Sequence, residues 1–276
     1  MSKYIIVNEA FLPAAAASVL ITDLAIQRGY GIFDFFKAID GQLMFLDDHL
    51  DRFYNSAAEM QLPVHKSRAE LKALLYALME KNNLPDSGIR ITLTGGYSPD
   101  GYTLAEPNMI ITQSAFKNPD FNSKGIKLIT HEHQRQLASI KTLDYLMAIR
   151  LQPLVKQQGA DDVLYHFNGI VKECPRANFF IVTHDHEVIT TAHGILKGVV
   201  RKQLLNMTDS GYSMIEKDIS LEDLRQCKEA FITSSTKNIL PVTAIDGQII
   251  GEGIAGKITT ALAEKFREVI VMGMLK

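Results

Sequence analysis

The amino-acid sequence predicts a mixed α/β fold with two domains. Its 276 residues exceed the roughly 100–200 residues of one typical domain. Segments with the two-residue period of strands alternate with segments of helical period along the whole chain, without an internal repeat. One polar segment, 116–124, contains Pro119 and is typical of a linker. We therefore expect an N-terminal domain over residues 1–115 and a larger C-terminal domain over residues 125–276.

The expected N-terminal domain alternates strands with helices. Its strands are predicted at residues 4–7, 18–22, 31–39, 42–46, 89–94 and 109–114. The pair Asp40-Gly41 predicts a hairpin, because both central residues of a type I′ turn need positive φ. One helix is expected over 47–62, and a second begins at Ser67, where Glu70 completes a capping box, and ends before Pro85.

The expected C-terminal domain contains more strands. They are predicted at residues 126–130, 163–167, 170–173, 178–183 and 230–234. Helices are predicted at residues 143–158, 197–207, 221–227 and from about 254. Asn168-Gly169 and Asp246-Gly247 predict two further hairpin turns.

Composition excludes several classes of protein. The 29 Lys and Arg residues balance 31 Asp and Glu residues, which excludes a polybasic nucleic-acid binder and an acidic tail. No uninterrupted apolar run reaches the ~20 residues of a membrane span. The apolar stretch 12–26 is not expected to be a signal peptide, because Pro13 interrupts it. Cys174 and Cys227 lie far apart, so no disulfide framework is expected and a reducing cytoplasm is favoured.

Most candidate motifs favour a structural interpretation. The histidine pairs His131/His133 and His184/His186 have no Cys or carboxylate at metal-ligand spacing, so a surface turn or a strand face is favoured over a metal site. We therefore expect no bound metal. No glycine pattern fits a dinucleotide-binding loop, and no GxSxG elbow of a serine hydrolase is present.

Lys141 and Glu173 are the candidates for chemistry. Lys141 lies between apolar neighbours at a predicted helix start, and a lysine in a partly dry site can become a nucleophilic amine that forms a Schiff base. The alternative is a solvated surface lysine. Glu173 ends a hydrophobic strand, where a carboxylate needs a cation; a salt bridge to Arg176 or to a surface lysine is the alternative to a functional role.

Five segments together carry a family resemblance. They are GYGIFDFFKAIDGQLMFLDDHLDRFYNSA, IKTLDYLMA, VKECPRANFFIV, ILKGVVRKQLL and EAFITSSTKNILPVTAIDG. In this order they resemble the class IV, fold type IV pyridoxal-phosphate aminotransferases, from about residue 23 to 247. That group contains branched-chain aminotransferases, D-amino acid transaminases and aminodeoxychorismate lyases. The resemblance implies a small N-terminal α/β domain, a larger C-terminal pseudo-barrel domain and pyridoxal 5′-phosphate as cofactor.

The resemblance also implies roles for individual residues. Lys141 matches the lysine that binds the cofactor covalently and shuttles the proton. Glu173 matches the carboxylate that pairs with the pyridine nitrogen and so keeps the ring an electron sink. Arg52 matches the phosphate-binding arginine, although an i,i+4 pair with Asp48 is the alternative. The remaining matches also concern the cofactor. Its phosphate is matched by the backbone amides of Gly198 and Val199 and by the hydroxyls of Ser235 and Thr236. Tyr145 matches a tyrosine that contacts the phenolic oxygen, and a packing role is the alternative.

Departures from the family pattern concern the substrate. Arg28 stands where branched-chain enzymes carry an aromatic residue, while Phe33 keeps the framework of that loop. Gly95 stands about where D-amino acid transaminases carry the arginine of their Arg-x-His carboxylate trap. A substrate carboxylate still needs a cation, and Arg28, Arg90 and Lys237 are the candidates. Arg90 has the alternative of a solvated sheet face.

The sequence thus favours a D-amino acid transaminase with a rebuilt carboxylate pocket. The expected reaction moves the amino group of D-glutamate or D-alanine to a 2-oxo acid such as 2-oxoglutarate. The resemblance implies a homodimer, because in this family the loop that carries Arg28 commonly reaches the neighbouring subunit's site. An L-branched-chain aminotransferase, an aminodeoxychorismate lyase and a cofactor-binding homologue without activity are the alternatives.

Overall fold

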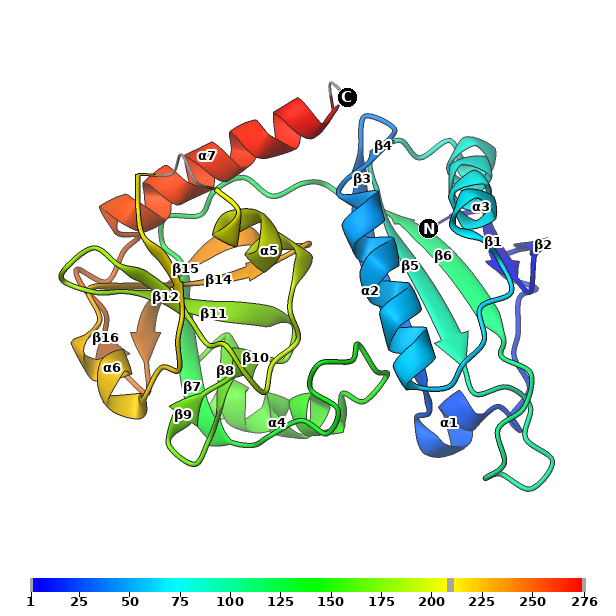
Figure 1. Ribbon diagram of the computed structural model, residues 1–276, viewed down its shortest axis with the longest axis horizontal. Helices are drawn as coiled ribbons and strands as arrows, with labels where there is room; N and C mark the ends of the chain where they lie inside the picture. The colour runs from blue at the N-terminus through cyan, green and yellow to red at the C-terminus, as the bar shows by residue number, and fades with distance from the viewer. Residues whose placement is uncertain (1, 208–210, 275–276) are drawn as a thin grey trace. The chain divides into compact units, whose positions relative to one another are not determined.

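A computed structural model describes residues 2–207 and 211–274, which form two compact units (Figure 1). The first unit contains Met1–Asn118, Ile140–Asp144 and the chain end from Gly273; the second contains Pro119–Ser139 and Tyr145–Met272. Residues 1 and 276, at which the predicted domains begin and end, lie outside the described residues. Residues 140–144 were expected in the C-terminal domain, whereas in the structure this short segment belongs to the first unit.

The first unit is built on a six-stranded antiparallel sheet in the order β2-β1-β6-β5-β3-β4. Its strands are β1 (Tyr4–Val7), β2 (Ala10–Pro13), β3 (Gly31–Ile39), β4 (Gln42–Leu43), β5 (Ser87–Thr94) and β6 (Met109–Ala115). Its helices are α1 (Leu24–Arg28), α2 (Leu46–Glu59) and α3 (Arg68–Asn82). Helices α2 and α3 cover one face of the sheet (Figure 1). The core between them includes Phe53 of α2 and Ile32 and Phe36 of β3, all fully buried.

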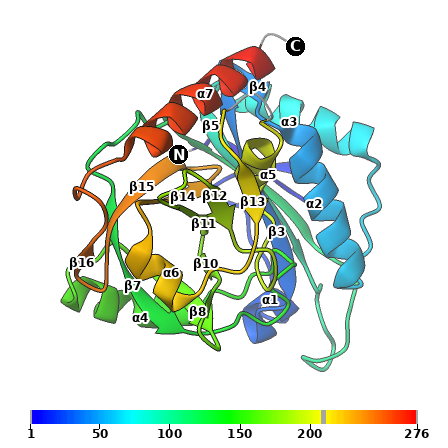
Figure 2. The same cartoon turned by 60° about the vertical axis from the view of Figure 1, so that its left-hand side comes forward.

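The second unit is built on a ten-stranded sheet that curls on itself (Figure 2). Its strands are β7 (Ile126–Glu132), β8 (Asp162–Phe167), β9 (Ile170–Val171), β10 (Glu173–Cys174), β11 (Ala177–Val182), β12 (Val188–Thr190), β13 (Met214–Glu216), β14 (Glu229–Ser234), β15 (Asn238–Ile245) and β16 (Gln248–Ile249). Its helices are α4 (Leu146–Gln157), α5 (Val199–Leu205), α6 (Leu221–Gln226) and α7 (Lys257–Met274). The main path of the sheet runs β13-β12-β11-β14-β15-β7-β8-β9, with β10 beside β11 and β16 beside β15.

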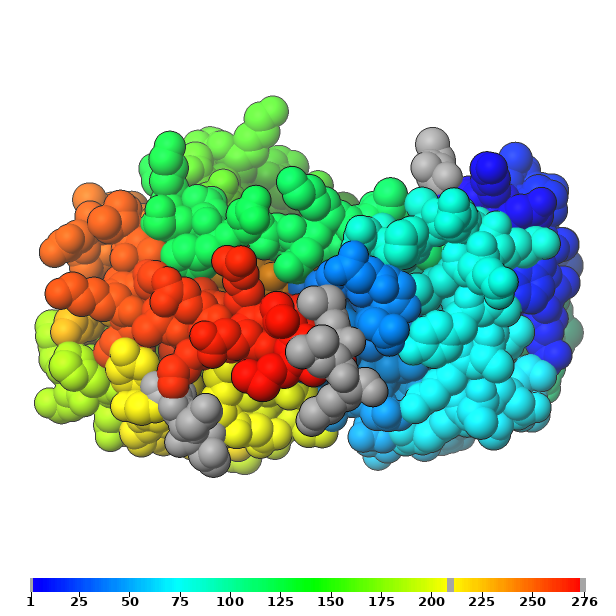
Figure 3. All heavy atoms as spheres, turned by 90° about the horizontal axis from the view of Figure 1, so that it is seen from above, coloured from blue at the N-terminus to red at the C-terminus, as the bar shows by residue number. Residues whose placement is uncertain are grey.

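Helix α7 of the second unit buries the apolar residues that the sequence pattern placed on one side of it. Its residues at four-residue spacing, Ile258, Leu262, Phe266 and Ile270, are buried, as the predicted amphipathic helix requires. Its other side forms exposed surface, which Figure 3 shows from above. The buried carboxylate of Glu229 accepts hydrogen bonds from the first backbone amides of α7, so the helix start is anchored to β14.

Local turn and cap signals are confirmed. The three predicted Asx-Gly turns have positive φ at both residues, for example 48° at Asp40 and 79° at Gly41. The capping box of Ser67 and Glu70 is present at the start of α3. The mixed α/β fold class is likewise confirmed. Among the described helices none is long and apolar enough to span a bilayer.

One strand prediction is wrong, and one confirmed helix begins later than predicted. Residues 18–22 form no strand; Leu20 and Ile21 there are exposed, whereas the unpredicted β2 pairs with β1. The helix predicted over 143–158 begins only at Leu146, because the preceding residues pair with β3. A one-dimensional pattern cannot distinguish an apolar segment that pairs with a distant strand from the first turn of a helix.

Candidate functional site

Lys141 is held by the backbone of the first unit. Its carbonyl accepts a hydrogen bond from the Phe33 amide at 3.0 Å, and the neighbouring Thr142 bridges to Ile32 of β3. The Lys141 Nζ lies 4.6 Å from the centroid of the Phe33 ring, a cation–π contact. The half-buried amine therefore has a defined position against an apolar surface, which is the setting that makes a lysine a usable nucleophile and base.

Arg90 lies against the same aromatic ring. Its guanidinium carbon is 3.9 Å from the Phe33 centroid, and its Nε donates to the Thr92 hydroxyl at 3.2 Å. Phe33 and Thr92 are partners in the β3/β5 pairing, so all three side chains share the sheet face opposite to α2 and α3. Arg90 is exposed, yet the structure brings Lys141, Arg90 and Phe33 together.

Arg52 belongs to a buried polar cluster that the sequence analysis missed. Its Nε and one terminal nitrogen donate to the two carboxylate oxygens of Asp34, each at 2.8 Å, and His49 Nδ1 lies 2.7 Å from Asp34 Oδ1. Burial alone would raise the pKa of Asp34, which is 1 % exposed, but the adjacent Arg52 charge holds this pKa well below its usual range. Burial lowers the pKa of His49, and because an ionised Asp34 carboxylate can only accept, the His49 ring donates the hydrogen bond between them.

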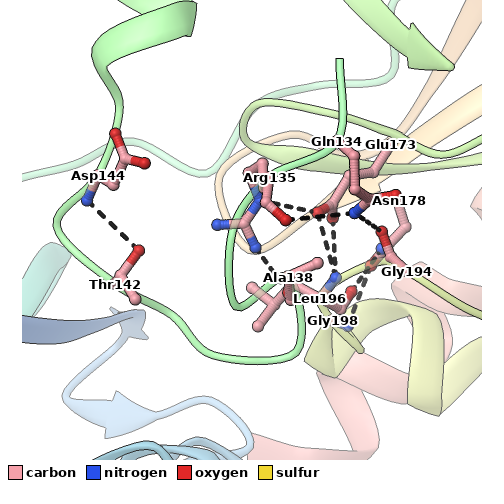
Figure 4. Close-up of polar contacts among 10 residues, drawn as sticks. All are labelled: Gln134, Arg135, Ala138, Thr142, Asp144, Glu173, Asn178, Gly194, Leu196 and Gly198. Carbon is pink, nitrogen blue, oxygen red and sulfur yellow. Dashed lines mark hydrogen bonds and ion pairs between the residues drawn. The ribbon is translucent and has the colours of Figure 1, made fainter. Parts of the chain in front are cut away.

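Glu173 is held by three donated hydrogen bonds in the second unit (Figure 4). The Leu196 amide lies 3.2 and 3.1 Å from its two oxygens, and Arg135 Nε lies 3.1 Å from Oε1. Arg135 also donates to the Ala138 carbonyl at 2.7 Å, which orients its guanidinium. These donors stabilise the ionised carboxylate, which can accept a further hydrogen bond from a cationic ring nitrogen. Arg135, rather than the Arg176 considered from sequence, supplies the ion pair described here.

The predicted phosphate residues lie at two turns of the second unit. Gly198 precedes α5 and donates its amide to Asn178 Oδ1 at 3.0 Å, and Val199 is the first residue of that helix. Ser235 and Thr236 form the turn between β14 and β15.

The remaining predicted residues lie apart from these groups or have other partners. Lys237 Nζ is 3.5 Å from Asp162 Oδ2 in the second unit. Tyr145 is the half-buried residue before α4. Arg28 is exposed at the end of α1 and donates to the Gln27 carbonyl.

Gly198 is required by sterics rather than by an unusual backbone. Its φ of −69° suits any residue, but a Cβ there would collide with Asn178 Oδ1. We expect Gly198→Ala to lower the melting temperature by several degrees, a typical effect of about 1–2 kcal/mol in overpacked sites. Differential scanning calorimetry measures this shift. Gly273→Ala, where a Cβ meets open space, is the control and should melt no lower than the wild type.

Comparison with known proteins identifies the family. The profile described as Amino-transferase class IV matches residues 31–245, well over half of the chain. The chain belongs to the class IV aminotransferase family. A D-alanine aminotransferase of Listeria monocytogenes serotype 4b is 32% identical over 278 residues, covering 97% of this chain and 96% of that protein. A putative branched-chain-amino-acid aminotransferase of Methanocaldococcus jannaschii is 29% identical, with 96% of each chain covered.

A solved structure shows the same fold. The branched-chain aminotransferase from Thermoproteus uzoniensis, solved with norvaline, superposes with a TM-score of 0.88 at 23% identity, covering 99% of this chain and 96% of that one. The predicted resemblance and the fold type IV architecture are therefore confirmed.

Class IV aminotransferases use pyridoxal phosphate, and the residues of this aminotransferase fit that group. The predicted residues include an amine and a guanidinium in the first unit and a buried carboxylate and main-chain amides in the second, the types of group that would suit an aldehyde, a phosphate and a ring nitrogen. One buried atom also needs a polar partner: the Thr233 hydroxyl oxygen, on a residue 2 % exposed, has no hydrogen-bond partner within residues 2–207 and 211–274. Thr233 is paired with Asn178 across β14 and β11, next to the turn that carries Gly198.

Four polar residues of this aminotransferase were not among the site residues predicted from sequence. Asp34 could have been found, because a charged residue inside the apolar strand GIFDFF must have a partner. His49 and Arg52 stand three apart on one helix face, which was a second available signal. Arg135 and Asn178 lie in segments without such a signal.

Proposed function

We propose that this class IV aminotransferase is a pyridoxal-phosphate transaminase for D-amino acids such as D-glutamate and D-alanine. The amino-group acceptor in this proposal is a 2-oxo acid such as 2-oxoglutarate. The observation that carries the proposal is the shared contact of Lys141 and Arg90 with Phe33, because it joins a reactive amine and a carboxylate-binding cation on one sheet face. The D-alanine aminotransferases among the relatives, at 29% and 32% identity, support the choice of enantiomer.

Lys141 carries the central role in the proposed reaction. When bound, pyridoxal phosphate supplies an electron sink for the charge that develops at the substrate Cα. Lys141 Nζ would hold the cofactor in the resting enzyme, and as a free amine it would take the Cα proton as general base. The Phe33 ring that this amine contacts is also contacted by Arg90.

The other residues bind and orient. Glu173 holds a proton at the ring nitrogen, and Arg52, kept in place by Asp34, binds the phosphate. The amide of Val199 and the hydroxyls of Ser235 and Thr236 complete the phosphate site in this proposal. The Gly198 amide, predicted for the same role, instead donates to Asn178. Tyr145 either donates to the phenolic oxygen or packs beside it.

Two arginines are the favoured ligands of the substrate carboxylates. Arg90 binds the α-carboxylate from its position over Phe33. Arg28 binds a carboxylate in the site of a neighbouring subunit. The proposed enzyme is therefore a homodimer. We also propose that it is located in the cytoplasm. Lys237 is less favoured because Asp162 already neutralises it.

An L-branched-chain aminotransferase is the second candidate. The Methanocaldococcus jannaschii relative and the Thermoproteus uzoniensis structure carry that name. Arg90 does not separate the two candidates, because L-leucine and the D-amino acids all carry an α-carboxylate, so the choice between them rests on the assay below.

A spectroscopic assay distinguishes the candidates. The purified holoenzyme is mixed separately with D-glutamate, D-alanine and L-leucine, and the absorbance band of the bound cofactor is followed without a second substrate. Loss of the band with both D-amino acids and not with L-leucine supports the proposal. Loss with L-leucine alone would replace it by the second candidate, and no cofactor band at any concentration of added cofactor would refute both.

Arg90→Ile should raise the KM for D-glutamate by about ten- to a hundredfold, since a hydrogen-bonded charge contributes about 1.5–3 kcal/mol. The kcat should fall less, because Lys141 retains its backbone contacts. Steady-state kinetics with varied D-glutamate measure both values. Arg28→Ile should act in the same direction, whereas Arg225→Ile, an exposed arginine on α6, is the control. An unchanged KM in Arg90→Ile would remove Arg90 from the substrate site.

A further inference from the structure

The turn before α5 is held by two side chains that face each other on neighbouring strands. Glu173 of β10 and Asn178 of β11 are register partners. Both reach the same turn, residues 196–198, which belongs to no helix or strand (Figure 4). Because regular backbone hydrogen bonds do not shape this turn, side chains must supply its partners.

Asn178 holds the turn at two points. Its Nδ2 donates to the Leu196 carbonyl at 2.7 Å, and its Oδ1 accepts from the Gly198 amide at 3.0 Å. The side chain is 4 % exposed, so water cannot replace these bonds without opening the core. Glu173 takes the remaining polar group of Leu196, its amide. A single carboxamide thus sets the orientation of the two peptide groups on either side of Lys197, one residue before the start of α5.

From this geometry we infer that Asn178 is a positioning residue for phosphate recognition. It fixes the direction in which the chain enters α5 and therefore the direction of the Val199 amide. This inference rests on the proposed function, in which that amide binds the cofactor phosphate. Asn178 itself uses both of its polar ends on the turn, so it acts on the ligand through the backbone.

This role differs in a measurable way from that of Glu173. A residue that acts through the phosphate turn should matter for pyridoxal phosphate and not for pyridoxal, which lacks the phosphate. A residue that acts through the ring nitrogen should matter for both ligands. The ratio of the two dissociation constants therefore changes only when phosphate binding changes. A general loss of structure raises both constants alike and leaves the ratio unchanged.

The experiment titrates apoprotein with pyridoxal phosphate and with pyridoxal, followed by absorbance and by the shift of the melting temperature. In Asn178→Ala we expect the dissociation constant for pyridoxal phosphate to rise about ten- to a hundredfold, the usual range for losing supporting partners of a bound group. The constant for pyridoxal should stay within about twofold of the wild type, because the ring contacts are untouched. If Asn178→Ala does not fold, Asn178→Asp takes its place; it keeps the acceptor for Gly198 and loses the donor to Leu196.

Thr190→Val is the matched control. Thr190 is fully buried on β12, and its hydroxyl donates to the Phe179 carbonyl at 2.9 Å without touching the turn. It should lower the melting temperature while binding both ligands like the wild type. Equal weakening of both ligands in the Asn178 variant, or weakening of neither, would overturn the inference and leave the proposed function standing. A wild-type protein that binds pyridoxal phosphate no better than pyridoxal would refute the phosphate site of the proposed function and the inference with it.

Discussion

Lys141→Ala is expected to abolish both half-reactions of the proposed transamination. The variant loses the amine that attaches the cofactor and the base that moves the Cα proton, and proton transfer by a positioned group alone contributes about 10²–10⁴-fold. The fold should survive, because the segment is held through the Lys141 carbonyl and the Thr142 bridge rather than through the side chain. Single-turnover experiments with D-glutamate and, separately, with 2-oxoglutarate on the aminated enzyme measure each half-reaction.

Lys156→Ala is the control for this variant. Lys156 is exposed in the last turn of α4, so its removal should leave both half-reactions unchanged. Substantial turnover by a folded Lys141→Ala protein, verified by its melting temperature, would refute the central assignment of the proposed mechanism.

Asp34→Asn is expected to cause the largest loss of stability. The carboxylate is buried and accepts hydrogen bonds from Arg52, His49 and the Phe35 amide, so the change leaves a largely buried guanidinium without its anion. Breaking a buried pair from one side costs about 3–5 kcal/mol. Urea unfolding at pH 7 measures the loss. In the same variant, cofactor binding should weaken because Arg52 is no longer oriented.

The pH dependence of stability provides an independent test of this cluster. Because the folded-state pKa of Asp34 lies well below the unfolded value of about 3.9, its contribution is complete above that value and is lost as the pH falls below it. The lowered pKa of His49 acts in the same direction, starting below about pH 6.5. The wild type should therefore lose stability steeply between about pH 5 and pH 2.5, and Asp34→Asn should lose much less over that interval.

Asp51→Asn separates this effect from surface charge. Asp51 pairs with Arg68 at 2.6 Å, but both side chains are about half exposed, and such pairs contribute about 0–1 kcal/mol. Its acid unfolding curve should match that of the wild type. If Asp34→Asn behaved like Asp51→Asn, the buried cluster would not be the source of the acid sensitivity.

Sequence reasoning succeeded where structure depends on near neighbours in the chain. The Asx-Gly turns need only two residues that tolerate positive φ, as at Asp40-Gly41, and the capping box of α3 needs only Ser67 and Glu70. Helix α7 was recognised from its four-residue apolar spacing. The five segments, in their order along the chain, indicated the class IV aminotransferase family, and the family profile confirms that membership.

Sequence reasoning failed where a residue's environment depends on distant segments. Residues 18–22 and β2 have similarly apolar patterns, and only the availability of β1 as a partner decides which becomes a strand. The same applies to 140–144, whose pairing with β3 shortens α4. Apolar periodicity indicates that a segment is buried, but it does not say against which strand.

For the candidate site, the family resemblance of five ordered segments selected Lys141, Glu173 and Arg52, because residue types alone left each of them with a structural alternative. Only the tertiary structure shows which residues form hydrogen bonds with their side chains. Arg135 reaches Glu173 across 38 positions of sequence, and Arg52 is oriented by Asp34 from another element. Hydrogen bonds and ion pairs of this kind act over about 3 Å in space, and the chain brings their two ends together only when the sheets and helices have packed.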